Sequence, residues 1–208
     1  MKKELTRCPW CASCDIYTDY HDKEWGVPVH DDKKHFEFLV LESAQAGLSW
    51  LTVLKKRENY KKAYMNFDAK KVAKFGPEKI DELMNNEGII RNLKKIEASI
   101  NNAACFISIQ KEFGSFDSYI WSFTGGKPVV NKWRNLKELP PETELSDKIS
   151  KDLKKRGFKF IGSTIIYSYL QAVGVVNDHL VNCFKYIELN DEFYEFDRLK
   201  RKIITRRI

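Results

Sequence analysis

The chain has 208 residues, of which 43% are hydrophobic and 31% charged, and 36 basic against 29 acidic residues give it a net charge of +7. This composition is typical of a folded globular protein and excludes a disordered or fibrous chain. No apolar run reaches the roughly 18 residues of a membrane-spanning helix, and the N-terminus has no apolar core of a signal peptide. We therefore expect a cytoplasmic protein, without a membrane partner, whose five cysteines are reduced.

Helical spacing of apolar residues dominates the chain, which predicts an all-α fold of about eight or nine helices. The predicted helices lie at 33–54 with a break at Gly47, and at 60–67, 69–75, 77–85, 89–113, 116–123, 146–156, 163–173 and 178–187. The best candidate for a strand, at 128–130, is short. It falls in the irregular segment 124–145, which is either a surface loop or a boundary between two helical lobes.

Cysteine and histidine residues occur near both ends of the chain. His179 and Cys183 are four residues apart, so they share one face of the predicted helix. Such a pair suits tetrahedral zinc, and Cys8 and His21 would complete a set of four ligands. Because four protein ligands leave no open position, the zinc would be structural and would join the two ends of the chain. The alternatives are that these are ordinary buried residues, or that another thiol between residues 8 and 14 is the first ligand.

Glu42 is the only charged residue between Phe38 and Leu54. A helix that is apolar nearly all round is usually buried, and a buried carboxylate needs a partner or a function. The alternative is a glutamate on the one exposed side of a core helix. Four aromatic residues nearby either pack in the core or form a stacking pocket for a flat ligand; they are Tyr17, Tyr20, Trp25 and Trp50.

Three basic segments, at 55–57, 84–95 and 154–160, are candidates for contacts with phosphate groups. The last two adjoin predicted helix N-termini, whose free amides attract anions. Basic residues at helix ends are commonly just solvated, but three such segments in one basic chain favour a nucleic-acid partner.

Seven motifs in order resemble those of the bacterial DNA-3-methyladenine glycosylase I family, from about Arg7 to Tyr186. The motifs are RCPW at 7–10, YHDKEWGVP at 20–28, LE followed by QAGLSW within 41–50, KKRENY at 55–60, GIIR at 88–91, KKRGFKF at 154–160 and VNDH at 176–179. The resemblance implies a helix–hairpin–helix fold with one structural zinc. It also implies an enzyme that hydrolyses the N-glycosidic bond of 3-methyladenine in alkylated double-stranded DNA and leaves an abasic site.

The resemblance assigns roles to individual residues. The zinc ligands would be Cys8, His21, His179 and Cys183. Glu42 would be the catalytic carboxylate that reads the adenine edge, Tyr20 and Trp50 would hold the ring, and Trp25 and Tyr17 would line the pocket. The DNA contacts would be the hairpin residues Gly88, Ile89 and Arg91, the basic Lys159, and Leu48 as a wedge in the space that the extruded nucleotide leaves.

The sequence departs from the family pattern at three places. The hairpin has one glycine where most of the superfamily has two, and Cys11 and Cys14 stand beside the first predicted zinc ligand. A basic extension at 189–208 follows the predicted glycosylase domain at 1–188 and has no assigned role, and neither has Cys105. No lysine is placed to attack the sugar, so we expect a monofunctional hydrolase. We also expect a monomer. The alternative is a non-catalytic, zinc-stabilised helical DNA-binding protein whose Glu42 and aromatic residues belong to the core.

Overall fold

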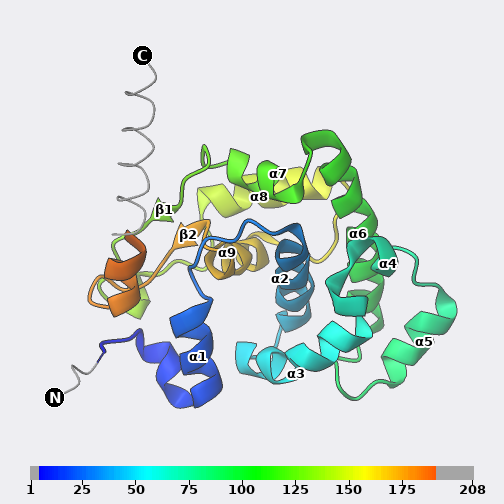
Figure 1. Cartoon of the computed structure of the whole chain (residues 1–208), viewed down its shortest axis with the longest axis horizontal. Helices are drawn as coiled ribbons and strands as arrows, with labels where there is room; N and C mark the ends of the chain where they lie inside the picture. The colour runs from blue at the N-terminus through cyan, green and yellow to red at the C-terminus, as the bar shows by residue number, and fades with distance from the viewer. Residues whose placement is uncertain (1–4, 191–208) are drawn as a thin grey trace, which may run out of the picture.

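Helices α2 (Asp32–Gln45) and α9 (Ser163–Ala172) lie at the centre of the computed structural model, which describes residues 5–190 (Figure 1). The longer helices around them are α1 (Asp15–Lys23), α3 (Trp50–Ala63), α5 (Pro77–Asn85), α6 (Leu93–Phe113), α7 (Phe116–Ser122) and α8 (Glu144–Lys155). Short helical elements are η1 (Pro9–Ser13), η2 (Met65–Phe67), α4 (Ala69–Val72) and η3 (Leu136–Glu138). The described chain is mostly helical, in agreement with the predicted all-α fold, and its only strands are two short ones. The described helices include none with the length and apolarity needed to cross a membrane.

Most of the longer helices begin where a polar side chain accepts a hydrogen bond from a free amide. The side chains of Asp31, Ser49 and Asn92 do so at the starts of α2, α3 and α6. Helix α2 is buried along most of its length, as its apolar sequence predicts. It stops before Gly47, whose φ of +78° allows the chain to reverse direction into α3.

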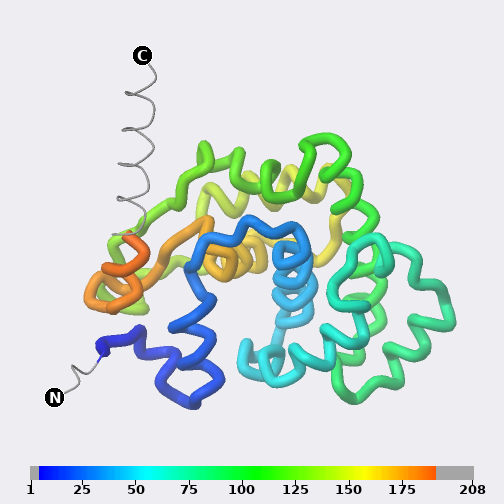
Figure 2. Tube along the Cα trace, viewed as in Figure 1, coloured from blue at the N-terminus to red at the C-terminus, as the bar shows by residue number. Residues whose placement is uncertain are grey.

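The two ends of the described chain meet, as Figure 2 shows. The amide of Phe184 donates to the carbonyl of Thr6 at 2.9 Å. Strands β1 (Val129–Val130) and β2 (Val176–Asn177) form a two-stranded parallel sheet in the same region. The short strand predicted at 128–130 is therefore present, paired with a strand that the sequence analysis did not predict.

Several predicted helix boundaries are wrong. Helix α6 begins at Leu93 rather than at Ile89, and the predicted continuation of α3 to Phe67 is instead a left-handed turn at 65–67. Elements η1 and α1 were not predicted from the sequence. A helix was predicted from Asp178, but residues 178–183 are not helical. The reason is that strand β2 and the hydrogen bond from the His179 amide to the Asn177 side chain hold residues 178–180 out of a helix, and 181–182 form a turn. The predicted helix is present from residue 184. Of the basic extension, residues 191–208 lie outside the described residues.

Candidate functional site

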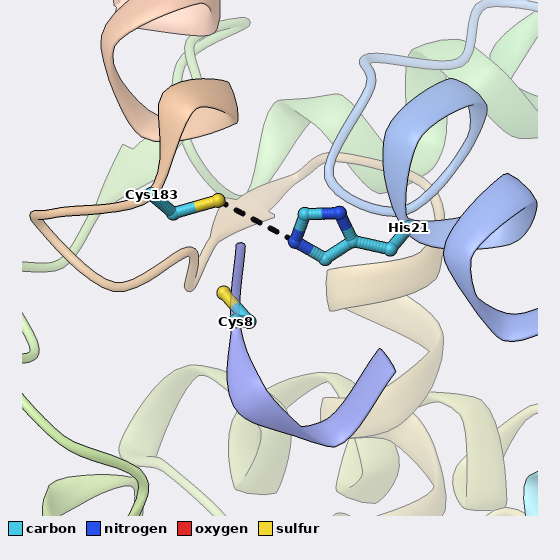
Figure 3. Close-up of side chains that lie close together, drawn as sticks. All are labelled: Cys8, His21 and Cys183. Atoms are coloured by element: carbon cyan, nitrogen blue, oxygen red, sulfur yellow. Dashed lines mark hydrogen bonds between the residues drawn. The ribbon is translucent and has the colours of Figure 1, made fainter. Parts of the chain in front are cut away.

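Cys8, His21 and Cys183 form a buried group that can hold a metal ion, with ligand atoms within 4.8 Å of one another. Figure 3 shows the three side chains pointing toward one another from three separate segments. The Cys183 sulfur lies 3.4 Å from His21 Nε2. The hydrogen bond from the Cys8 thiol lowers the pKa of Cys183, whereas that bond and burial raise the pKa of Cys8. One thiolate is therefore already favoured in the group, as metal binding requires.

His179, the fourth predicted ligand, lies beside this group but is not one of its three members. Its ring centroid is 5.0 Å from that of His21. Its Nδ1 is 3.0 Å from the Asn177 side-chain oxygen, so Nδ1 carries the proton, while its buried Nε2 has no hydrogen-bond partner among the described residues. Burial, more than the nearby charges of His21 and Lys185, lowers the pKa of His179 to about 3. A neutral imidazole with an unused buried lone pair fits a metal ligand.

A hydrogen-bond network surrounds the candidate ligands. His21 Nδ1 lies 2.8 Å from a carboxylate oxygen of Asp22, which also accepts hydrogen bonds from the Arg7 guanidinium. Burial would raise the pKa of Asp22, but the hydrogen bonds from Arg7 and His21 outweigh it and lower that pKa. The carboxylate thus holds His21 with Nε2 toward the two sulfurs, the arrangement usual for metal-bound histidines.

The structure distinguishes among the N-terminal thiols. The Cys11 thiol donates to the Cys8 carbonyl at 3.1 Å, and Cys14 is only half-buried. Only Cys8 of these three lies in the group with His21 and Cys183. The spacing argument for His179 and Cys183 was wrong in its detail, because the two residues come from a non-helical segment and not from one helical face.

A cavity of about 230 Å³ lies beside α2 and is walled mainly by aromatic rings. Its lining side chains are Trp10, Tyr17, Tyr20, Trp25, Glu42, Gln45, Trp50, Leu139, Ser168 and Gln171. All five residues predicted for the base pocket are thus brought together. The rings of Tyr20 and Trp50 stand 5.5 Å apart at 54°. This volume is below that of sites for drug-sized ligands, which suits one flat bicyclic ring.

Glu42 is only 4% exposed, and its Oε2 has no hydrogen-bond partner among the described residues. Burial raises the pKa of Glu42 to about 8. The indole Nε1 of Trp50, also in the cavity wall, is likewise buried and unpaired within the described chain. A buried acceptor and a buried donor without partners are costly in a folded protein unless a ligand supplies them.

Neighbouring hydrogen bonds hold the cavity walls in place. The Tyr17 hydroxyl accepts from the Leu51 amide at 2.8 Å, which joins α1 to the first turn of α3. The side-chain amide of Gln171 donates to Asp178 at 2.7 Å. Because a carboxylate only accepts, this bond fixes the orientation of the Gln171 amide group. The cavity is therefore largely preformed.

Half of the lining residues were not predicted from the sequence. Trp10 belongs to the RCPW motif at 7–10, but nothing in the local sequence pattern predicts that it lines the pocket. Its ring centroid lies 5.5 Å from that of Tyr17 and 5.1 Å from that of Trp25. Gln45 is one turn from Glu42 on α2, and this helical spacing was a signal that could have found it. Leu139 and Ser168 come from distant segments, and no local signal identifies them.

The predicted DNA-contacting residues lie in the segments that follow α2 and α5, except for the exposed Lys159, which lies in the loop between α8 and α9. Leu48, directly after Gly47, is 41% exposed. The turn between α5 and α6 contains Gly88, where a Cβ atom would lie 2.9 Å from the Asn59 side chain, so only glycine fits. Arg91 is exposed and reaches Glu87 only at 3.8 Å. Ile89 is 2% exposed, so its side chain belongs to the core and leaves only its main chain for the predicted DNA contact.

Two lysines link this turn to the α2–α3 connection. The Lys95 ammonium donates to the carbonyls of Ala44 and Ala46 at 2.8 and 2.6 Å, at the end of α2. The Lys56 ammonium of α3 donates to the Glu87 carbonyl at 2.6 Å. The two segments predicted to contact DNA are therefore tied to each other.

A mostly helical fold with a helix–turn–helix element at α5–α6 and an aromatic cavity around a buried carboxylate is the architecture of a base-recognising glycosylase class. The chain belongs to the methyladenine glycosylase family, whose model matches residues 10–186.

Individual relatives are similar over nearly their whole length. The chain is 51% identical over 178 residues to the DNA-3-methyladenine glycosylase of Haemophilus influenzae, covering 86% of this chain and 96% of that protein. It is 48% identical over 182 residues to DNA-3-methyladenine glycosylase 1 of Escherichia coli, covering 88% and 97%. The fold matches a crystal structure of 3-methyladenine DNA glycosylase I with a TM-score of 0.84 and 47% identity, over 86% of this chain and 98% of that one. The Staphylococcus aureus enzyme, studied for 3-methyladenine recognition, matches with a TM-score of 0.83 and 38% identity, over 88% and 97%.

Proposed function

We propose that the protein is a DNA repair glycosylase that hydrolyses the bond between 3-methyladenine and deoxyribose and leaves an abasic site. The observation that carries this proposal is the buried Glu42 carboxyl, which has an unpaired oxygen in a cavity of aromatic rings. The family and the names of its relatives support the same reaction. A base must leave the stack before it can enter such a cavity.

Glu42 gives the cavity a means to select a cationic base. Methylation at N3 makes adenine cationic and weakens its glycosidic bond, so the enzyme needs no strong general acid. In the empty cavity the pKa of about 8 keeps Glu42 largely protonated at neutral pH. A cationic ring beside it favours the carboxylate, which then accepts hydrogen bonds from the adenine edge and balances the positive charge. Normal adenine is neutral and gains neither the charge pairing nor the full cation–π attraction of the rings.

The remaining parts of the reaction are assigned by position. Leu48 fills the space that the extruded nucleotide leaves. Arg91 in the α5–α6 turn and Lys159 in the α8–α9 loop contact phosphates of double-stranded DNA. The described residues that line the cavity include no lysine, so no Schiff base forms and the enzyme is a monofunctional hydrolase. We expect it to act as a monomer in the cytoplasm.

The candidate metal group fits zinc. Two sulfurs and two imidazole nitrogens are the donor set of a structural tetrahedral site, and the unpaired Nε2 of His179 supplies the fourth donor beside Cys8, His21 and Cys183. Zinc held there contributes folding free energy and no chemistry. It joins the N-terminal segment to residues 179–183.

The deciding experiment measures base release. Duplex DNA alkylated with a methylating agent is incubated with the protein, and free 3-methyladenine and abasic sites are quantified in parallel. We expect equal amounts of both, and a loss of release in Glu42→Gln with an unchanged fold. Binding to the duplex without any released base would instead support the non-catalytic DNA-binding protein.

A further inference from the structure

The loop between α8 and α9 presents an aromatic ring in an unusual backbone conformation. Phe160 has a φ of +53°, in the left-handed region that residues other than glycine rarely adopt. Its side chain is nevertheless 37% exposed, so core packing does not require this conformation. Strain of this kind persists only where the surroundings enforce it, and it concentrates at functional sites.

Three buried polar side chains enforce the conformation. The Ser43 hydroxyl of α2 donates to the Phe160 carbonyl at 3.0 Å. The Asn102 side chain of α6 binds both the amide and the carbonyl of Lys159, each at 2.8 Å. The Ser150 hydroxyl of α8 donates to the Ile161 carbonyl at 2.7 Å. Three helices thus fix the main chain on both sides of one exposed ring.

The same contacts place Phe160 near the segments proposed to meet DNA. Ser43 is in the last turn of α2, five residues before Leu48. Asn102 is two helical turns from Lys95, which holds the end of α2 from the same helix. Phe160 therefore stands beside the helix end that leads from Glu42 to the proposed wedge.

The residue next to Phe160 carries a free charge. Lys159 is exposed, and its ammonium forms no ion pair with the residues that the structure describes. A cation beside an exposed, rigidly held ring matches the chemistry of a nucleotide, which offers a phosphate and a flat base.

We propose that Phe160 is a second apolar contact to the DNA, whose ring stacks on a base left exposed when the damaged nucleotide is extruded. Lys159 binds the adjacent phosphate. The inference rests on the proposed function, because extrusion exposes that base. The enforced left-handed conformation keeps the ring in place before DNA arrives, so none of its stacking is lost to ordering the loop.

The test compares Phe160→Ala, Phe160→Trp and Phe160→Gly in the full chain. With a duplex that contains an abasic-site analogue, we expect Phe160→Ala and Phe160→Gly to bind about fivefold to a hundredfold more weakly, the range for loss of one base–aromatic stack. Phe160→Trp should recover most of the affinity. Phe160→Gly should melt no lower than the wild type, because glycine adopts the left-handed conformation freely. Phe113→Ala is the matched control, since Phe113 is also 37% exposed but lies at the far end of α6.

A spectroscopic readout distinguishes stacking from a general loss of structure. With 2-aminopurine opposite the abasic-site analogue, the wild type and Phe160→Trp should quench its emission more than Phe160→Ala does. Binding of free 3-methyladenine, followed by tryptophan fluorescence, should be the same in all variants because the cavity does not include Phe160. Wild-type duplex affinity in Phe160→Ala, or no recovery in Phe160→Trp, would overturn the inference. Absence of base release by the wild type would overturn the proposed function instead.

Discussion

Replacing Glu42 by glutamine tests whether its carboxyl is as deeply buried as the structure shows. Burial raises the pKa of Glu42 from an ordinary 4.5 to about 8. Between these two pH values the folded protein holds a proton that the unfolded chain releases. The stabilisation from this group is therefore complete below pH 4.5 and is lost as the pH rises through 8. Glutamine has a similar shape and does not titrate, so the variant lacks this pH dependence.

The expected size follows from the two pKa values. Relative to Glu42→Gln, the free energy of unfolding of the wild type should fall by about 2.5 kcal/mol between pH 5 and pH 7. For a chain of this length that difference corresponds to a relative change in melting temperature of about 5–10 °C.

Urea unfolding of both proteins at several pH values between 5 and 8 measures the difference directly, because titrations common to both cancel. Glu58→Gln, on the exposed side of α3, controls for the removal of a glutamate elsewhere. Parallel stability curves for the wild type and Glu42→Gln would show that Glu42 reaches solvent or a partner, and the selection mechanism built on its burial would be wrong.

Three further predictions concern the metal group, a DNA contact and the end of α2. The purified protein should contain about one zinc per chain, which Cys183→Ser should lose and Cys11→Ser should keep; a metal-free protein of unchanged melting temperature would contradict the proposed site. Arg91→Ala should weaken binding to an abasic-analogue duplex and lower the slope of log K against log salt concentration by about 1, and an unchanged slope would remove Arg91 from the phosphate contacts. Lys95→Met should lower the free energy of unfolding by about 1–3 kcal/mol, because two carbonyls at the end of α2 lose a charged donor, and Lys95→Arg should restore part of it. Equal stability of the two Lys95 variants would show that the ammonium contributes little there.

The elements that the sequence predicted well are those that local chemistry determines. Helix α5 begins at Pro77 after Gly76 and ends at Asn85, as predicted, because proline and glycine mark its start. The helix predicted at 178–187 is present only from residue 184, because β2 and the hydrogen bond from the Val181 amide to the Trp133 carbonyl set the course of the chain before it. Helix α1 was missed because its sequence is a poor helix former with Thr, Tyr, His and Asp, and packing against η1 and α3 stabilises it.

The candidate site divides in the same way. Glu42 was predicted because a single charge in an apolar helix is visible in the sequence. Gln171 was not predicted, because its role depends on an amide orientation that Asp178 fixes from the segment after β2. The strained Phe160 was not predicted either, since the three side chains that hold it come from three helices.

Helix α1 connects the proposed zinc site with the proposed base cavity. Tyr20 lines the cavity while His21, the next residue, joins the metal group. The Trp25 ring, also in the cavity wall, packs at 4.5 Å against the ring of His179. None of the four proposed ligands lines the cavity, yet the rings of two cavity residues, Trp10 and Trp25, pack against the rings of His21 and His179.

Loss of the metal should therefore weaken binding of free 3-methyladenine as well as lower the melting temperature. Titration of the base into zinc-loaded and chelator-treated protein, well below the melting temperature of both, measures the effect by tryptophan fluorescence. We expect lower affinity in the treated protein and recovery when zinc is restored. The same affinity with and without zinc would mean that packing alone holds α1, since the Phe184–Thr6 hydrogen bond already joins the two ends of the described chain.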